Sequence, residues 1–480
     1  MTIAEIQPPS ASAGCEQPPV TPLAILSRLG PGLIIAASIV GSGELIATTK
    51  TGADAGFELL WLILIACVIK VFVQVEFGRF AITEARSSIE GMNLLPGPRW
   101  RVNWLVWFWV LMFVAQLGQL GGIVGGVGQN LAMCFPFTGD FLADLDRSPT
   151  AAAVMTWDDV YWSLIVTVVT AIMLFNGRYG LVQNVATALV VGFTAVTIFN
   201  LGALPYVSEV KLSWGDFAEG LRFHLPARQP GIDSPLATAL AAFGIIGVGA
   251  SELVAYPYWC LEKGYARFTG PRQADSGWAV RAAGWLRVMR WDAACSLLIY
   301  TLATVAFYLL GAAVLHPEGL SPSGNQMIRT LTRMYEHVFG RWGEWVFLFG
   351  AFAVLYSTFF VAIAGNARIA ADCLRLVRQR PADEREQHWW VQLFCATFPF
   401  LSLGAYVLHK DPVQLVLISG MMQAIALPML GAAALYFRYR RCDARLTPGR
   451  LWDICLWCSV IGLCVAGLGA PLAKMLDIWR

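Results

Sequence analysis

Apolar runs of about twenty residues recur from residue 29 almost to the end of the chain, and they restrict its fold more than any other feature. A run of that length crosses the roughly 30 Å hydrocarbon core of a bilayer as a helix. Lipid offers the backbone no hydrogen-bond partners, so each span must satisfy its own N–H and C=O groups. Since 57% of the 480 residues are hydrophobic and 14% are charged, we predict an all-α integral membrane protein.

We predict about eleven spans. A tail of residues 1–27, rich in Pro, Ser and Ala, precedes them without the basic stretch of a signal peptide, so we expect a disordered cytoplasmic segment. The expected spans are Gly30–Lys50, Leu59–Ile82, Val102–Phe135, Tyr161–Phe175, Leu181–Leu204, Leu236–Leu261, Asp292–Leu315, Trp345–Cys373, Trp390–Leu408, Val413–Phe437 and Leu451–Met475.

Basic residues gather in alternate loops, as at Arg86, Arg178, Arg267 and Arg378, whereas the opposite loops include the acidic stretch 138–146. The positive-inside rule then places the N-terminus in the cytoplasm and, with an odd number of spans, the C-terminus outside. We expect a multi-pass protein of the plasma (inner) membrane. The basic clusters lie beside helix ends, which favours topology control and lipid headgroup contact over nucleic-acid binding.

One octet occurs nearly twice. Residues 40–47 are VGSGELIA and residues 248–255 are VGASELVA, in the first and sixth spans. An inverted repeat of five helices would place these spans in corresponding positions, often broken near the midplane around a shared site. The flanking glycines supply the conformational freedom for a break, and Pro257 favours unwinding after the second octet. These glycines are Gly41, Gly43, Gly247 and Gly249.

Each octet carries a glutamate, Glu44 or Glu252, inside an apolar segment. A midplane carboxylate costs at least about 2.5 kcal/mol, so each needs a partner, a water-filled cavity or a proton. Two converging carboxylates suit a cation or a shared proton. A structural ion pair is the alternative, with Lys70 neutralising one glutamate. Arg79 and Glu76 suit a separate pair at helical spacing.

Smaller predictions accompany these. The serines beside the glutamates, Ser42 and Ser251, are expected near the site, with the backbone carbonyls of Gly41 and Ala250 as further ligands. Lys70 joins the two glutamates as a candidate for proton coupling. Glu84 and Asp292 are expected to be solvated near cytoplasmic helix ends, while Gln119 and its neighbouring amides on the third span are expected to bond between helices.

Several segments resemble the Nramp divalent-metal transporters. GPGLIIAASIVGSGELIATTKTGADAGFELLW, residues 30–61, is similar to their first helix and following loop, and GIIGVGASELVAYPYW to their sixth. DPVQLVLISGMMQAIALP and YSTFFVAIAGNARIA resemble their tenth and eighth helices. The resemblance implies a LeuT-like inverted repeat of two five-helix units plus an additional helix. The units would be residues 28–205 and 206–437, and the extra helix 438–480.

The site motifs depart from that family. Its Asp-Pro-Gly-Asn signature becomes residues 41–44, GSGE, and its Met-Pro-His signature becomes residues 251–253, SEL. On the tenth helix Ala426 replaces the Gln before Leu-Pro, while Gln423 lies about one turn earlier and is expected to contribute to the binding site. Loss of the thioether leaves oxygen donors, which suit Mg²⁺, Ca²⁺ or Mn²⁺ better than softer metals.

The favoured function is a secondary active transporter that moves a divalent cation by alternating access, Mg²⁺ or Mn²⁺ above softer metals, with metal ligands Glu44 and Glu252. The alternative is a proton-coupled carrier of an organic cation or other small solute that no longer binds metal. A membrane sensor would need an output domain. An enzyme is not expected: the sequence shows no catalytic motif, and its histidines lie in loops or at helix ends. We expect a monomer with no cofactor, whose partners are lipid and a small cation.

Overall fold

The computed structural model describes residues 14–145, 156–176, 179–207, 213–226, 235–273, 276–381 and 383–478. The described chain is helical apart from one short hairpin, in which β1 (Arg99–Trp100) pairs antiparallel with β2 (Val102–Asn103). The prediction of an all-α membrane protein is confirmed. The long helices are α4 (Leu60–Glu84), α6 (Trp104–Cys134), α8 (Trp157–Phe175), α9 (Tyr179–Val207), α14 (Ser276–Leu310), α16 (Gly343–Val377), α17 (Glu384–His409), α18 (Pro412–Tyr436) and α19 (Arg450–Ile478).

Two of the expected spans consist of shorter pieces. The first contains α2 (Pro31–Ile39), the π-helical η1 (Ser42–Thr48) and α3 (Thr49–Ala55), and the sixth contains α11 (Pro235–Phe243) and α12 (Ala250–Glu262). Short helices cap both ends of the bundle. They are α1 (Pro22–Leu26), α5 (Ser88–Asn93), α7 (Asp140–Leu145), α10 (Trp214–Gly220), α13 (Tyr265–Thr269), α15 (Met327–Phe339), η3 (Gly324–Gln326), η4 (Gly340–Trp342) and η6 (Ala444–Leu446). The π-helical segments η2 (Gly311–Leu315) and η5 (Phe437–Arg441) continue α14 and α18 directly.

Ten stretches of the described chain are long and apolar enough to cross a membrane. They correspond to ten of the eleven expected spans. The remaining one, Leu236–Leu261, is divided by the non-helical residues 244–249, so neither α11 nor α12 is long enough alone. Another difference is that α14 begins at Ser276 and not near Asp292, because the basic stretch before it continues the same helix.

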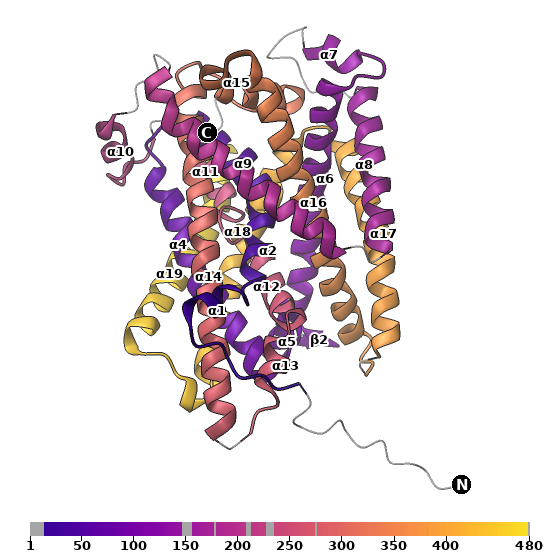
Figure 1. Cartoon of the computed structure of the whole chain (residues 1–480), viewed down its shortest axis with the longest axis vertical. Coiled ribbons are helices and arrows are strands. Elements are labelled where there is room, and N and C mark those ends of the chain that lie inside the picture. Colours follow the sequence, from indigo (N-terminus) through magenta and orange to yellow (C-terminus); the bar gives the residue numbers. More distant parts are fainter. Residues whose placement is uncertain are drawn as a thin grey trace.

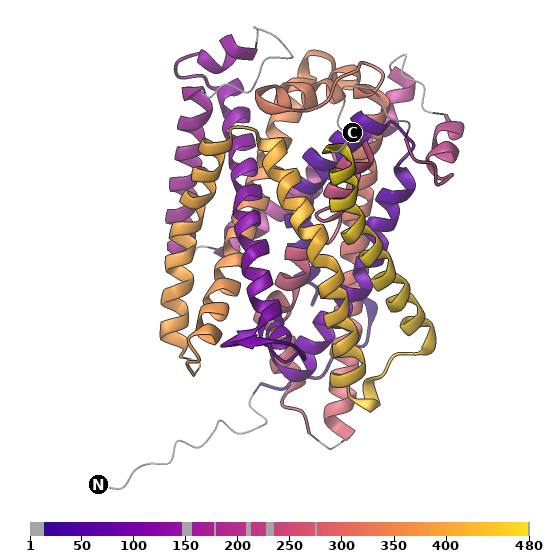
Figure 2. The same ribbon diagram turned by 180° about the vertical axis from the view of Figure 1, so that it is seen from behind.

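Helices five spans apart pack against each other. Thus α4 contacts α14, α6 contacts α16, and α8 contacts α17. This pairing fits the inverted repeat of a LeuT-like fold, in which corresponding helices of the two halves face one another. Figure 1 shows α1 in the lower half of the bundle, and Figures 1 and 2 show α19 running from the lower end of the bundle toward the upper end.

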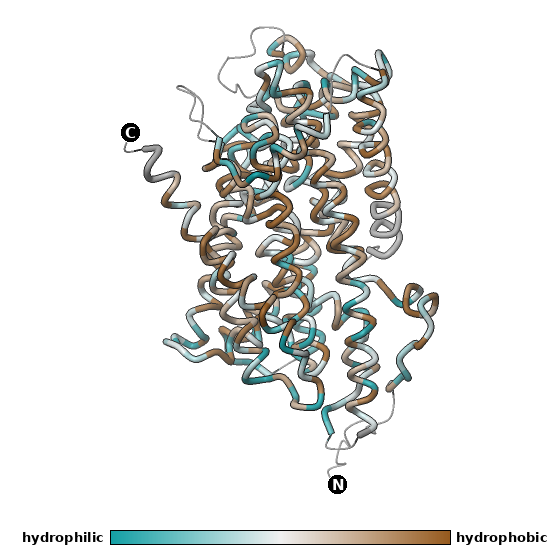
Figure 3. Tube along the Cα trace, turned by 90° about the vertical axis from the view of Figure 1, so that its left-hand side faces the viewer, coloured by the Kyte–Doolittle hydropathy of each residue, from teal (hydrophilic) through white to brown (hydrophobic). Residues whose placement is uncertain are grey.

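The outer helices expose apolar side chains around the middle of the bundle. Figure 3 shows a mainly hydrophobic trace there, with hydrophilic stretches gathered toward both ends. Exposed leucine, isoleucine and phenylalanine side chains on this surface would be unfavourable in water and suit a lipid environment. Examples are Ile172, Phe199, Leu401, Ile461 and Leu468.

Part of the tail that was expected to be disordered is ordered. Residues 14–27 lie against α13 and α14, with the Glu16 N–H donating to Phe268 O and the Trp285 indole donating to Glu16 O at 3.0 Å. Arg28 also pairs with Glu16 at 3.1 Å. These partners hold a segment whose composition alone gives no sign of order. Residues 1–13 lie outside the described part of the chain.

Asp292 anchors the start of α2 from α14. Its Oδ1 accepts from the N–H of Gly30 at 2.9 Å, and its Oδ2 accepts from the N–H of Gly32 at 2.5 Å and from Tyr256 at 3.1 Å. The carboxylate thereby binds N–H groups that have no partner within α2. The expectation of a solvated Asp292 is wrong, because the side chain is completely buried.

Replacing Asp292 with Asn should loosen this anchor. An amide nitrogen would face backbone N–H groups that now have an acceptor, and a buried unsatisfied donor costs about 1–3 kcal/mol. We expect a clear fall in Tm in detergent. The matched control is Asp383→Asn, because Asp383 accepts from the Arg385 N–H at the N-cap of α17, where Asn is equally suitable. Equal losses in both variants would contradict the anchoring role.

Glu76 and Arg79 form the predicted local ion pair. Arg79 Nε lies 3.1 Å from Glu76 Oε2, and both side chains are buried. Trp452 of α19 donates to Glu76 at 2.7 Å, and Arg79 donates to Leu446 O at 2.8 Å. The charges of Glu76 and Arg79 are therefore paired and hydrogen-bonded. The pair holds α4 against α19 and is separate from the repeated octets.

Candidate functional site

The sixth span is broken at residues 244–249, beside the second octet. Within this segment Gly247 has a φ of 60°, the left-handed region that favours glycine. Gly244 permits close approach instead, because a β-carbon there would lie 1.9 Å from Gly420 O of α18. The segment therefore uses one glycine for its turn and another for backbone contact.

The first span is distorted rather than fully unwound. A turn at Val40 and Gly41 separates α2 from η1, and the wider π-helical turns keep the backbone bonded. Gly41 and Gly43 serve close packing: a β-carbon on Gly41 would lie 2.0 Å from the Thr358 hydroxyl oxygen, and one on Gly43 would lie 2.8 Å from Ile245 O. Thus the two distorted segments touch through backbone.

One smaller expectation about these segments is wrong. Pro257 lies inside a continuous α12, so it does not unwind the helix; the Ser88 hydroxyl donates to Val254 O in the adjacent turn at 2.5 Å. The Gly41 carbonyl accepts one hydrogen bond, from the Leu45 N–H at 2.9 Å, and a carbonyl oxygen has a second lone pair that can bind a ligand. Ala250, the other expected carbonyl donor, is the first residue of α12.

Glu44 lies at the contact between the two distorted segments. Its side chain is wholly buried, and its Oε1 is 3.0 Å from both the Gly247 N–H and the Thr304 hydroxyl. The other oxygen, Oε2, has no hydrogen-bond partner. Thr304 is also 2.6 Å from Tyr300 O, and one hydroxyl hydrogen cannot serve both acceptors well. Glu44 thus has unused acceptor capacity that suits a cation or a proton.

Glu252 begins a chain of polar side chains on the opposite side of the break. It lies in the first turn of α12 and is partly accessible, where the helix dipole favours a carboxylate. Ser251 donates to Glu252 at 2.7 Å and lies 3.0 Å from Gln423 Oε1. Gln423 Nε2 donates to Gln119 at 2.7 Å, and Gln119 donates to Ser42 at 2.9 Å.

The structure therefore brings five of the predicted residues into one region by hydrogen bonding, but they do not all surround a single point. They are Glu44, Glu252, Ser42, Ser251 and Gln423. Glu44 bonds to Gly247 within the break, and Glu252 lies just after it. The two glutamates have different hydrogen-bond partners.

Three polar residues of this region were not predicted as part of it. Gln119 and Ser419 complete the link between Gln423 and Ser42, with Ser419 donating to Gln119 at 3.1 Å. Thr304 supports Glu44 from α14. Their signal in the sequence is weak, because buried amides and hydroxyls on membrane helices most often bond between helices, as Gln119 was expected to do.

Lys70 does not neutralise a glutamate by direct contact. The described residues contain no ion pair within 4.0 Å between Lys70 and either Glu44 or Glu252. Its ammonium donates instead to the carbonyl of Phe243, the last residue of α11, and, at 2.6 Å, to the carbonyl of Ile246 within the break. Both carbonyls belong to the broken sixth span.

Oxygen atoms dominate the donors of this region. In the described part of the chain no three or more His, Cys, Asp or Glu side chains cluster closely enough to hold a metal ion. A bound cation would therefore need a mixed set of carboxylate, hydroxyl, amide and backbone oxygens, which suits hard cations.

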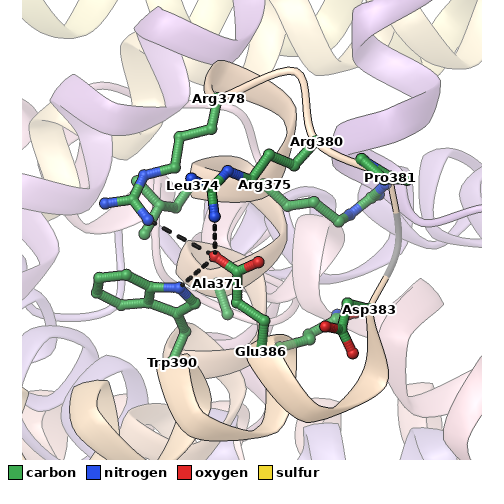
Figure 4. A pocket seen from close by; sticks show the side chains of 10 residues that line it. Ala371, Leu374, Arg375, Arg378, Arg380, Pro381, Asp383, Glu386 and Trp390 are labelled. Atoms are coloured by element: carbon green, nitrogen blue, oxygen red, sulfur yellow. Dashed lines mark hydrogen bonds and ion pairs between the residues drawn. The ribbon is translucent and has the colours of Figure 1, made fainter.

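Two pockets lie away from the glutamates, near the turn between α16 and α17. Figure 4 shows the smaller, about 20 Å³, where Glu386 accepts from Arg380 at 3.1 Å and from Trp390 at 3.3 Å. That volume holds about one water. The larger, about 800 Å³, is lined in part by the ion pair of Arg368 and Glu262, 2.9 Å apart. In both pockets, acidic side chains counter the positive charge of the arginines.

A family model described as Nramp, natural resistance-associated macrophage protein-like, matches residues 32–470. A divalent metal cation transporter, MntH, of Deinococcus radiodurans is 23% identical over 420 residues, 87% of this chain and 83% of that protein. The MntH protein of Caldanaerobacter subterraneus is 22% identical over 342 residues, 71% of this chain and 69% of that protein.

Among solved structures, a variant of the manganese transporter of Eremococcus coleocola matches with a TM-score of 0.64. It is 15% identical, and the match covers 98% of this chain and 95% of that one. This likeness concerns the fold. Since the family model spans most of the sequence, the chain is a multi-pass membrane protein that belongs to the Nramp family.

Proposed function

We propose that this protein is a secondary active transporter that moves a divalent cation by alternating access, with Mg²⁺ or Mn²⁺ preferred over softer metals. The substrate would bind beside the distorted first and sixth spans. Membership of the family supports cation transport, and relatives carry names of divalent metal and manganese transporters. The N-terminus would be cytoplasmic, in the plasma (inner) membrane, and the protein would act as a monomer.

One observation carries the proposal: a buried carboxylate, Glu44, keeps one oxygen without a partner at the contact between the two distorted spans. Burying an uncompensated carboxylate is strongly unfavourable. A cation would supply the missing interaction. Glu252, Ser251 and Ser42 are the other oxygen donors that we assign to the substrate, with Gln423 supporting them.

The preference for hard cations follows from these donors. Carboxylate, hydroxyl and amide oxygens suit Mg²⁺ and Mn²⁺, and neither predicted ligand position holds a thioether or an imidazole. Mg²⁺ keeps several waters when it binds, so a site with few protein carboxylates is adequate. Alternating access would then expose this site to each side in turn.

The proposal is tested by calorimetric titration of the purified chain with Mg²⁺, Mn²⁺ and Ca²⁺. We expect binding heat for Mg²⁺ or Mn²⁺ that is lost in Glu44→Gln. Cd²⁺ serves as the soft comparison and should bind more weakly. Absence of heat with every divalent cation, in protein that unfolds cooperatively, would contradict the proposal.

A second candidate function is a proton-coupled carrier of an organic cation. The observation that favours it is Lys70, whose ammonium already uses two carbonyls that a metal ion would otherwise find free. Polyamines added to the same titration distinguish the candidates. Heat with polyamines and none with divalent cations would support the organic carrier.

A further inference from the structure

Lys70 extends from α4 to the end of the half-helix α11. Its side chain is completely buried, and its ammonium donates to Phe243 O and Ile246 O. The ammonium also lies 4.7 Å from the centre of the Phe243 ring, within the range of a cation–π contact. Two carbonyl oxygens and an aromatic face are the surroundings that a small cation prefers.

The position of these carbonyls explains why a cation belongs there. Phe243 is the last residue of α11, and the last carbonyls of a helix have no partner within it and carry the negative end of its dipole. Ile246 lies in the non-helical segment that follows. At the break of the sixth span they are buried, so water does not hydrate them freely. Glu44, whose Oε2 has no hydrogen-bond partner, contacts the same break at the Gly247 N–H.

We infer that residues 243–246 form a monovalent-cation site that the chain fills with its own ammonium group, Lys70. The tethered cation satisfies the end of α11 and fixes α4 to the break. With the side chain shortened, the same site would take a small ammonium ion from solution. This goes beyond the proposed transport of a divalent cation and does not depend on it.

A purely structural lysine would behave differently from a resident cation. If only the volume of Lys70 matters, an uncharged side chain of similar length replaces the lysine without loss of thermal stability. Where charge matters, the shortened variant regains stability from an added cation of the right size. Lys70→Ala lacks the three carbons and the nitrogen of propylammonium, which is therefore the matching probe.

The experiment measures thermal unfolding of the full chain in detergent, without divalent cations. We expect Lys70→Ala to unfold at a lower temperature than the unsubstituted protein, and its Tm to rise saturably with propylammonium. Choline at equal ionic strength and 1-propanol should not reproduce the rise, because one is too bulky and the other uncharged. Without the substitution the protein should not respond.

Lys70→Met keeps the volume but removes the charge, so it should remain less stable and should not respond to propylammonium. If Lys70→Ala cannot be purified, the stability of Lys70→Met alone still tests whether the charge of Lys70 is required. Lys50→Ala is a control, because Lys50 pairs with Asp54 at 3.2 Å and binds no carbonyl pair in the described structure. Full stability of Lys70→Met, or equal rescue of Lys70→Ala by 1-propanol, would overturn the inference. Failure here leaves the divalent-cation proposal standing, since no divalent cation is used.

Discussion

Replacing Glu44 with Gln is expected to abolish cation uptake while the protein still folds. Removing one partner of a buried charge pair costs about 3–5 kcal/mol. Each 1.4 kcal/mol is a factor of ten in affinity, so substrate binding should weaken at least about a hundredfold. Uptake into proteoliposomes and calorimetry of the purified variant measure the two effects.

The same substitution should preserve stability in the absence of substrate. A neutral amide of the same size removes the burial of a carboxylate whose Oε2 has no partner, and it can still accept from Gly247. We therefore expect a Tm equal to or above that of the unsubstituted protein. Loss of folded protein together with loss of uptake would instead mean that Glu44 is structural.

Glu76→Gln is the matched control, because Glu76 is also a completely buried glutamate but has partners. The Glu76→Gln substitution leaves the buried Arg79 guanidinium without its counter-charge. The expected pattern is the reverse: lower thermal stability, with cation affinity retained by the molecules that fold. Unimpaired uptake in Glu44→Gln, or equal loss of affinity in both variants, would refute the assignment of Glu44 to the substrate site.

The repeated octets allowed the main features of this site to be predicted from sequence. Their symmetric glutamates indicated the first and sixth spans as corresponding helices, and the structure brings Glu44 against the break that precedes Glu252. Apolar run length predicted about eleven spans, because crossing a bilayer fixes the minimum length of a helix. Ten of them correspond to stretches of the described chain that are long and apolar enough to cross a membrane. These signals are local in sequence.

What sequence did not predict depends on partners that are distant along the chain. Lys70 was expected to meet a glutamate, but a lysine that reaches carbonyls has no sequence pattern, since every residue carries a carbonyl. Gln119 was expected to bond between helices, and only its partners, Ser42 and Gln423, link it to the site. Asp292 is similar, because its partners are backbone N–H groups 260 and 262 residues away.

Glycines near the octets illustrate the same limit. Sequence predicted that they would provide conformational freedom, and Gly247 does so with its left-handed backbone. Gly43 and Gly244 instead allow one backbone to touch another, which depends on how the helices pack. The two roles look alike in a sequence and differ only in the folded chain.

Gly244→Ala should therefore have one of the largest structural effects in the molecule. The new β-carbon would lie 1.9 Å from Gly420 O and 2.5 Å from Ala424 N, both backbone atoms of α18. No side-chain rotation relieves such a contact, so α11 and α18 must separate. Overpacking alone costs about 1–3 kcal/mol, and the gap between the helices would add to it. We expect a large fall in Tm and in the yield of folded protein.

Gly404→Ala tests whether the effect comes from contact or from loss of a glycine. Gly404 lies within α17, and a β-carbon there meets no atom within 4 Å. Alanine in the middle of a helix is favoured over glycine by about 1 kcal/mol, so this variant should match or exceed the stability of the unsubstituted protein. Since the 244–249 segment also carries the Gly247 N–H that binds Glu44, any Gly244→Ala protein that folds should bind cations weakly. Normal Tm and normal affinity in that variant would mean that the sixth span does not lie against α18 as described.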